Sequence, residues 1–194
     1  GEQEIFSLDE MIKIWDPARI SKSPAIFDPL KLRAINAAYI RALPAEEFRK
    51  LADPFIDQAV HVQIDRDLLC ANLQPRCEVL EDIPPQLDFF DAVLPIDAEM
   101  YRNKKQKTTP ESAKEALSAL LPVLEAQTDW SRDAIFEACK QKAEAMEKKN
   151  GWLLFPLGIA LSGKARTPGG GTDLAAMMGK EETLRRLNAA IEAL

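Results

Sequence analysis

The chain has 194 residues, is 46% apolar and carries a formal net charge of −6. The apolar fraction supports a sizeable core and excludes a disordered chain, while the acidic balance argues against a general nucleic-acid binder. No apolar run approaches the roughly 18 residues of a membrane-spanning helix, and no basic-then-apolar leader opens the sequence. We therefore expect a soluble cytoplasmic protein without a membrane partner.

Charge is unevenly distributed along the chain. Residues 1–149 hold 20 basic and 27 acidic side chains, whereas residues 150–194 hold 5 basic and 4 acidic ones. The C-terminal end is therefore the part that repels a polyanion least.

Cysteine and histidine are scarce, with Cys70, Cys77, Cys139 and His61 as the only examples. An odd number of cysteines without motif spacing argues against a disulfide framework. A single histidine without a cluster of ligands around it argues against a metal site or a catalytic triad. We predict reduced, mostly buried thiols, no metal and no catalytic residue.

The first half of the chain has helical patterns. Ser7 and Glu10 form a capping box that predicts a helix start. Pro29 follows Asp28 at the first position of a second helix, along which Leu32, Ile35, Tyr39 and Leu43 recur at helical spacing until Pro44. Further helices are predicted at about 45–59, 65–82 and 84–91.

The second half is also predicted to be helical. It begins with a basic connector over residues 101–107, and Thr109 and Ser131 are the expected caps of two helices ending near residues 127 and 149. The Asn150-Gly151 pair predicts a break at a left-handed glycine. The remaining helices are predicted at about 152–161, 172–178 and 180–193. Because no alternating strand pattern occurs, the predicted fold class is all-α and multihelical.

No motif in the chain indicates catalysis. Three glycines at 169–171 precede a predicted helix, but no strand precedes them, so they match a phosphate-binding loop poorly. Adjacent carboxylates such as Glu181-Glu182 are typical of solvated helix faces. The tripeptide Ser21-Lys22-Ser23 is similar to part of a nucleotide-binding signature loop but lacks its flanking pattern.

Four stretches carry a resemblance to a known family. They read IFSLDEMIKIWDPARISKSPAIFDPLKLRAINAAYIRALP, QPRCEVLEDIPPQLDFF, TTPESAKEALSALLPVLEAQTDW and LLFPLGIALSGKARTPGGGTDLAAMMGKEETLRRL. In this order they resemble the C-terminal, anticodon-binding half of bacterial glutamyl-tRNA synthetases, which are class I aminoacyl-tRNA synthetases. The resemblance covers essentially all of residues 4–194.

The resemblance implies a domain organisation. Residues 1–43 would form a stem-contact lead-in, residues 44–100 a first anticodon-binding helical subdomain and residues 101–194 a second one. The family's catalytic half uses ATP and Mg²⁺ to join glutamate to tRNA for protein biosynthesis, and its signature motifs do not occur here. We therefore expect no cofactor in this chain, which on its own would be an inactive part of a glutamate–tRNA ligase.

The resemblance also assigns the third anticodon base to Arg76. Anticodons for glutamate end in cytosine and those for glutamine in guanine. A guanidinium has only donors, so it can bind the acceptors of cytosine but leaves the donors of guanine unpaired. The alternative is that Arg76 forms a surface ion pair with Glu78 or Glu81.

The first two anticodon bases are assigned to the last subdomain. The resemblance places them against the helix 155–161 and the loop after it, where the candidate contacts are Lys164, Arg166, Thr167, Pro168 and Gly169. Glycines there would let the backbone approach a base. Related sequences usually carry arginine where this chain has Gly158, so that either Lys164 or Arg166 compensates or binding is weaker. The alternative for both cations is a solvated loop charge.

Two further candidates are lysines that lie outside these elements. Lys105 lies in the basic connector, which could contact phosphate between the subdomains or be a solvated hinge. Lys22 in the lead-in could contact the tRNA stem, as could Arg33. Trp130 and Trp152 are expected to pack in the core rather than stack on bases.

The expected partners are the tRNA(Glu) anticodon loop and the catalytic domain of the parent synthetase, with the chain itself a monomer. The alternative is a standalone helical module that binds a protein partner or regulates a synthetase. That alternative would expose an apolar patch around Ile5, Phe6, Ile12 and Trp15.

Overall fold

The computed structural model describes residues 3–19 and 27–194, and helices account for nearly all regular structure in these ranges. An isolated antiparallel bridge joins Asn103 and Thr108. The α-helices are α1 (Leu8–Ile14), α2 (Pro29–Ala42), α3 (Ala45–Ile56), α4 (Arg66–Leu73), α5 (Pro110–Ala126), α6 (Arg132–Ala145), α7 (Asn150–Ser162), α8 (Gly171–Met178) and α9 (Lys180–Ala193). Short 3₁₀ turns lie at Pro17–Arg19, Gln74–Arg76, Leu80–Asp82, Pro84–Gln86 and Ala98–Tyr101. The predicted all-α class is confirmed.

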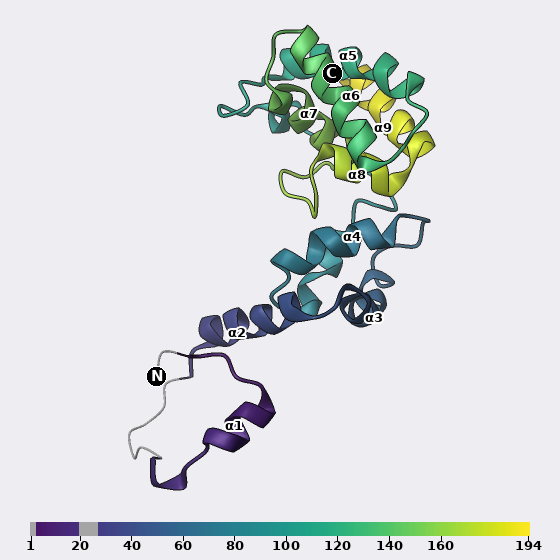
Figure 1. Cartoon of the computed structure of the whole chain (residues 1–194). Helices are drawn as coiled ribbons and strands as arrows, with labels where there is room; N and C mark the ends of the chain where they lie inside the picture. Colours follow the sequence, from purple (N-terminus) through teal and green to yellow (C-terminus); the bar gives the residue numbers. More distant parts are fainter. Residues whose placement is uncertain (1–2, 20–26) are drawn as a thin grey trace.

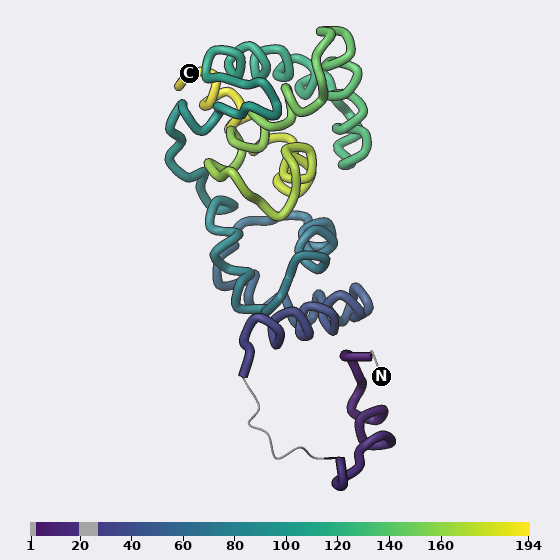
Figure 2. The backbone as a smooth tube through the Cα atoms, turned by 90° about the vertical axis from the view of Figure 1, so that its left-hand side faces the viewer, coloured from purple at the N-terminus to yellow at the C-terminus, as the bar shows by residue number. Residues whose placement is uncertain are grey.

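The helices form an elongated stack (Figure 1). α1 lies at one end, followed by a first bundle of α2, α3 and α4 with the 3₁₀ turns up to Gln86, and then by a second bundle of α5 to α9. The turned view in Figure 2 shows the same order along the stack. One hydrophobic core runs through both bundles, from Ile40 to Ala190. The predicted subdomain boundaries at residues 44 and 101 stay predictions.

The local start signals in the sequence are confirmed. The Ser7 hydroxyl accepts from Glu10 N, and the Glu10 carboxylate accepts from Ser7 N at 2.7 Å. Asp28 caps α2 and Thr109 caps α5, while Ser131 caps α6. Side chains at these positions accept hydrogen bonds from backbone N–H groups that have no partner within the helix.

Three predicted boundaries are wrong. The helix expected over 65–82 ends at Leu73, because Pro75 lies in a 3₁₀ turn, and the helix expected over 84–91 is a 3₁₀ turn at Pro84–Gln86. The break expected at Asn150-Gly151 occurs earlier. Glu147 adopts a positive φ of 55° after α6, and Asn150 is already the first residue of α7.

Several apolar side chains near the start of the chain face solvent. On α2, Ala37 and Ile40 are buried, whereas Leu32 is 54% and Tyr39 44% exposed. Of the apolar stripe expected on this helix, Leu43 packs against the core and Ile35 is half-buried, so only part of the stripe faces solvent. No helix within residues 3–19 or 27–194 combines the length and apolar character needed to cross a membrane, and the cellular location stays a prediction.

The three thiols are buried and unpaired, as predicted. Burial raises the pKa of Cys70 and of Cys77 to about 11, and that of Cys139 to about 12. A thiol with such a pKa is protonated at neutral pH, so these side chains act as small packing groups.

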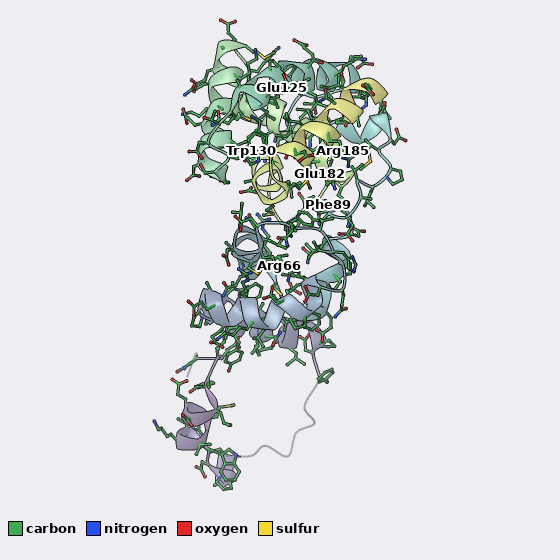
Figure 3. The ribbon with its side chains drawn as sticks, turned by 90° about the vertical axis from the view of Figure 1, so that its right-hand side faces the viewer. Arg66, Phe89, Glu125, Trp130, Glu182 and Arg185 are labelled. Atoms are coloured by element: carbon green, nitrogen blue, oxygen red, sulfur yellow. The ribbon has the colours of Figure 1, made fainter. Side chains whose placement is uncertain are left out.

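A buried arginine joins the two bundles. The Arg186 side chain on α9 is fully buried, with Nη1 donating to the carbonyls of Phe89 and Leu161 and Nη2 to the carbonyl of Phe90, each at 2.7 Å. Its Nε donates to Glu182 at 2.5 Å. Figure 3 shows Glu182 and Arg185 close to Phe89, where the second bundle meets the first. The chain leaving the first bundle is thereby fixed to the end of α7.

Replacing Arg186 should strongly destabilise the fold. Arg186→Ala leaves the buried carbonyls of Phe89, Phe90 and Leu161 without this donor. At about 1–3 kcal/mol for each unsatisfied buried group, the loss should be about 3 kcal/mol or more. The matched control is Arg185→Ala, because Arg185 binds the same Glu182 from the surface and should contribute about 0–1 kcal/mol. Urea unfolding followed by circular dichroism measures both, and equal losses would contradict this role.

Glu182 should make stability depend on pH. Hydrogen bonds from Arg185 and then Arg186 lower the pKa of Glu182 from 4.5 to about 2. The unfolded chain therefore takes up this proton first, so the stabilisation is complete above pH 4.5 and is lost as pH falls from 4.5 towards 2. Glu182→Gln should show a shallower acid loss of unfolding free energy than the wild type. Glu181→Gln, the adjacent control, should follow the wild-type curve, and a wild-type-like curve for Glu182→Gln would contradict the assignment.

Candidate nucleic-acid interface

The loop between α7 and α8 has a defined conformation. Gly163 ends α7 with a positive φ of 68°, and a Cβ there would lie 2.5 Å from the Leu94 carbonyl oxygen. The Thr167 hydroxyl donates to the Gly169 carbonyl at 2.6 Å. Asp173 accepts from Gly170 N at 2.7 Å at the start of α8. Backbone and side-chain hydrogen bonds thus shape the loop on both sides of Pro168.

Helices α7 and α8 approach each other very closely at Gly171. A Cβ on Gly171 would lie 2.7 Å from the Leu154 carbonyl oxygen and 2.9 Å from Gly158 N. At Gly158, by contrast, a Cβ would make ordinary contacts with Gly171 at 3.7 Å and beyond. The close approach therefore requires glycine at 171, whereas position 158 has room for a side chain.

Arg76 reaches this loop from the first bundle. Its Nη1 donates to the carbonyl of Pro168 at 3.1 Å, across 92 positions of sequence. The alternative ion pair with Glu78 or Glu81 is not observed within the described ranges. Glu78 instead binds Arg33 at 2.8 Å. The guanidinium of Arg76, which lies at the surface, is therefore held beside the loop.

A pocket of about 680 Å³ lies between Arg76, the loop and α7. Its size is typical of sites for small molecules or for parts of larger ligands. Its lining contains two guanidiniums, an aromatic ring, several glycines and no carboxylate. The lining residues are Arg76, Gln86, Leu154, Phe155, Gly158, Ile159, Ala165, Arg166, Thr167, Gly169, Gly170 and Gly171.

One face of α7 borders this pocket. Leu154, Phe155 and Gly158 are half-buried, whereas the flanking residues Leu153, Pro156 and Leu157 are buried. α7 is apolar around its circumference, so the sequence pattern alone does not reveal this face.

The predicted site residues of the last subdomain separate into two groups. Arg166, Thr167 and Gly169 line the pocket, and Pro168 is buried beside them as the acceptor for Arg76. Lys164 instead donates to the Pro85 carbonyl at 2.7 Å and forms an ion pair with Asp88. The assignments of these residues to tRNA stay predictions.

Lys105 and Lys22 are not part of this pocket. Lys105 is exposed in a turn closed by two hydrogen bonds of 3.1 Å between the backbones of Asn103 and Thr108. The expected connector is thus a compact turn before α5. Lys22 lies outside the described residues.

The side chains of Trp130 and Trp152 belong to the packing of the second bundle. Trp152 is buried, and Trp130 packs against the core with Nε1 donating to the Ala175 carbonyl at 2.9 Å, which agrees with the predicted packing role.

Gln86 lines the pocket with its side-chain amide donating to the Asp82 carbonyl at 2.7 Å. Sequence reasoning missed Gln86, because that segment was expected to be a regular helix.

Comparison with known protein families shows to which family this chain belongs. A family model described as an anticodon binding domain matches residues 36–191. The chain belongs to this family of anticodon-binding domains. The anticodon-binding part of the resemblance inferred from the sequence motifs is therefore confirmed.

Curated relatives of this anticodon-binding domain include glutamate–tRNA ligases. A glutamate–tRNA ligase of Clostridium botulinum (strain Hall) is 42% identical over 194 residues, which is 100% of this chain and 40% of the relative. The ligase of Clostridium tetani is 41% identical over 192 residues, covering 99% of this chain and 39% of its own length. The chain thus spans about two fifths of the length of these curated relatives.

Solved structures of the same kind share the fold. The glutamate tRNA ligase of Elizabethkingia meningosepticum, in complex with its amino acid, is similar with a TM-score of 0.80 and 27% identity over 99% of this chain and 38% of that one. The glutamate–tRNA synthetase of Elizabethkingia anophelis gives a TM-score of 0.76 and 26% identity, covering 98% of this chain and 37% of that one.

The two pocket glycines should respond differently to an added methyl group. Gly171→Ala forces a clash with the backbone of α7 and should cost about 1–3 kcal/mol. Gly158→Ala adds a methyl within a helix, where replacing glycine stabilises by about 0.5–1 kcal/mol. Thermal and urea unfolding of both variants test this contrast, which a stable Gly171→Ala would refute.

Proposed function

We propose that this chain recognises the anticodon loop of tRNA(Glu) as the anticodon-reading part of a glutamate–tRNA ligase. The observation that supports this most strongly is the pocket that combines Arg76 with the loop 164–171 and one face of α7. The resemblance assigns Arg76 to the third anticodon base, and the loop with α7 to the first two bases. All of these elements border this pocket. Single-stranded loops are read by stacking and by hydrogen bonds to the edges of splayed bases.

Arg76 is proposed to read the third anticodon base. One of its five N–H donors binds Pro168, which leaves donors for the N3 and O2 acceptors of cytosine. Guanine presents N–H donors at N1 and N2, which would face the guanidinium without an acceptor. Burying unpaired donors costs about 1–3 kcal/mol, which supports a preference for anticodons ending in cytosine.

The first two bases are proposed to lie along the loop and α7. Phe155 offers a half-buried ring for stacking. Thr167 and Gly169 offer backbone groups close to the pocket, where the glycines allow close approach. A base in this position would meet no carboxylate of the lining.

Gly158 removes the cation that related sequences usually have at this position of α7. Because the usual arginine is missing, Arg166 is the remaining guanidinium that lines the pocket together with Arg76. Lys164 is already bound to Pro85 and Asp88. We therefore assign the compensating contact to Arg166, and we expect affinity to fall with rising salt as counterions are released.

The lead-in is proposed to face the rest of a longer protein, in which a catalytic domain would use ATP and Mg²⁺. Ile12 is 65% and Trp15 67% exposed, and the relatives extend well beyond the matched region. The same exposure favours the second candidate, a helical module that binds a protein partner. RNA binding separates the two functions, because only anticodon recognition requires it.

Arg76→Gln should reduce the discrimination between cytosine and guanine. Glutamine offers both a donor and an acceptor, so the ratio of the two dissociation constants should fall by about tenfold, equivalent to about 1.4 kcal/mol. The measurement is a titration of anticodon stem-loops that end in cytosine or guanine, at low and moderate salt.

The matched control is Arg102→Gln, because Arg102 is an exposed arginine paired with Glu99 outside the pocket. It should leave the ratio unchanged. An unchanged ratio in Arg76→Gln would reject the assignment of the third base, and no binding of either stem-loop to the wild type at low salt would favour the partner-binding module.

A further inference from the structure

Lys164 binds the first bundle rather than extending into solvent. Its Nζ donates to the Pro85 carbonyl at 2.7 Å and pairs with the Asp88 carboxylate, and only 22% of its side chain is exposed. Both acceptors lie in the turn region that follows Asp82 and leads out of the first bundle. Lys164 is the residue directly after the glycine that ends α7, so this contact fixes the beginning of the loop.

The loop is therefore attached to the first bundle at two points. Lys164 attaches its beginning to Pro85 and Asp88, and the Pro168 carbonyl attaches its middle to Arg76. Residues 165–167 between these points line the pocket. The position of the Pro168 carbonyl beside Arg76 thus depends on where Lys164 holds the loop.

The residues directly after Asp88 are held from the interior. The carbonyls of Phe89 and Phe90, next to Asp88 in sequence, receive hydrogen bonds from the buried Arg186. The same guanidinium binds the Leu161 carbonyl near the end of α7. Lys164 therefore binds a fixed segment. Loss of its side chain would remove this attachment of the loop, while the backbone N–H of residue 164 stays bound to the Ser162 hydroxyl and Arg186 keeps the segment in place.

We propose that Lys164 is a positioning residue for the recognition of the third anticodon base. Its side chain holds the loop 164–171 against Arg76 and does not contact the RNA. Hydrogen-bond strength depends on direction, and the Pro168 carbonyl orients the Arg76 guanidinium. When the loop loses its attachment, Arg76 loses this orientation and distinguishes cytosine from guanine less well. The inference rests on the proposed function.

A direct contact between Lys164 and phosphate would have a different signature. Such a contact is independent of the base, so its loss would weaken binding of both stem-loops equally. It would also lower the magnitude of the slope of log K against log salt by about 0.7, the value for one phosphate on a single strand. A positioning role changes the ratio of the two affinities and leaves the slope unchanged.

The experiment compares Lys164→Met, Asp88→Asn and the double variant in titrations with stem-loops ending in cytosine or guanine at several salt concentrations. Lys164→Met should reduce the ratio of dissociation constants by about fivefold. Asp88→Asn should reduce it less, because the Pro85 carbonyl still accepts from Lys164, and the double variant should be no worse than Lys164→Met. The control is Lys140→Met, which removes an equal charge from an ion pair with Glu137 in α6 and should preserve the ratio.

Two results would overturn the inference while leaving the proposed function intact. One is a wild-type ratio in Lys164→Met. The other is an equal weakening of both stem-loops together with the smaller salt slope of a lost phosphate contact. A wild-type chain without any preference for cytosine would instead contradict the proposed function itself. Circular dichroism of the variants confirms folding, and Asp88→Asn tests the ion pair alone without changing the lysine.

Discussion

The arrangement of the two bundles depends on the burial of one guanidinium. A buried charge is costly unless it is paired and hydrogen-bonded, and Arg186 meets this requirement with Glu182 and three backbone carbonyls. These carbonyls belong to residues 89–90 and to the end of α7, two segments far apart in sequence. Neither segment can shift without leaving the guanidinium underbonded, so the contact fixes the chain that leaves the first bundle to the end of α7.

The candidate site is a consequence of this fixed arrangement. Arg76 comes from the first bundle and Pro168 from the second, and they meet across 92 positions of sequence. Gly171 lets α8 approach the backbone of α7, which brings the glycine-rich loop to the half-buried face of that helix. The pocket thus combines cationic, aromatic and backbone groups that no single element contains, as the reading of several successive bases requires.

Local chemistry was the predictable part of this structure. Caps such as Ser7 and Thr109 act within one helical turn, so their sequence patterns locate helix starts correctly. Glu147, rather than the expected glycine at 151, takes the positive φ after α6, which no residue preference favours. Arg186 with Glu182 has the spacing of an ordinary surface pair, so its burial could not be predicted. The family resemblance indicated Arg76 and the loop, but only the structure shows that they touch.

We propose that the anticodon loop binds in the pocket between Arg76 and the loop 164–171. The most direct test of this binding is a titration of the ¹⁵N-labelled chain with the anticodon stem-loop of tRNA(Glu), followed by NMR. We expect backbone amide shifts to concentrate at Gly158, at Gly169 to Gly171 and around Arg76. Shifts confined to the lead-in or to the turn around Lys105, with these glycine amides unchanged, would contradict it.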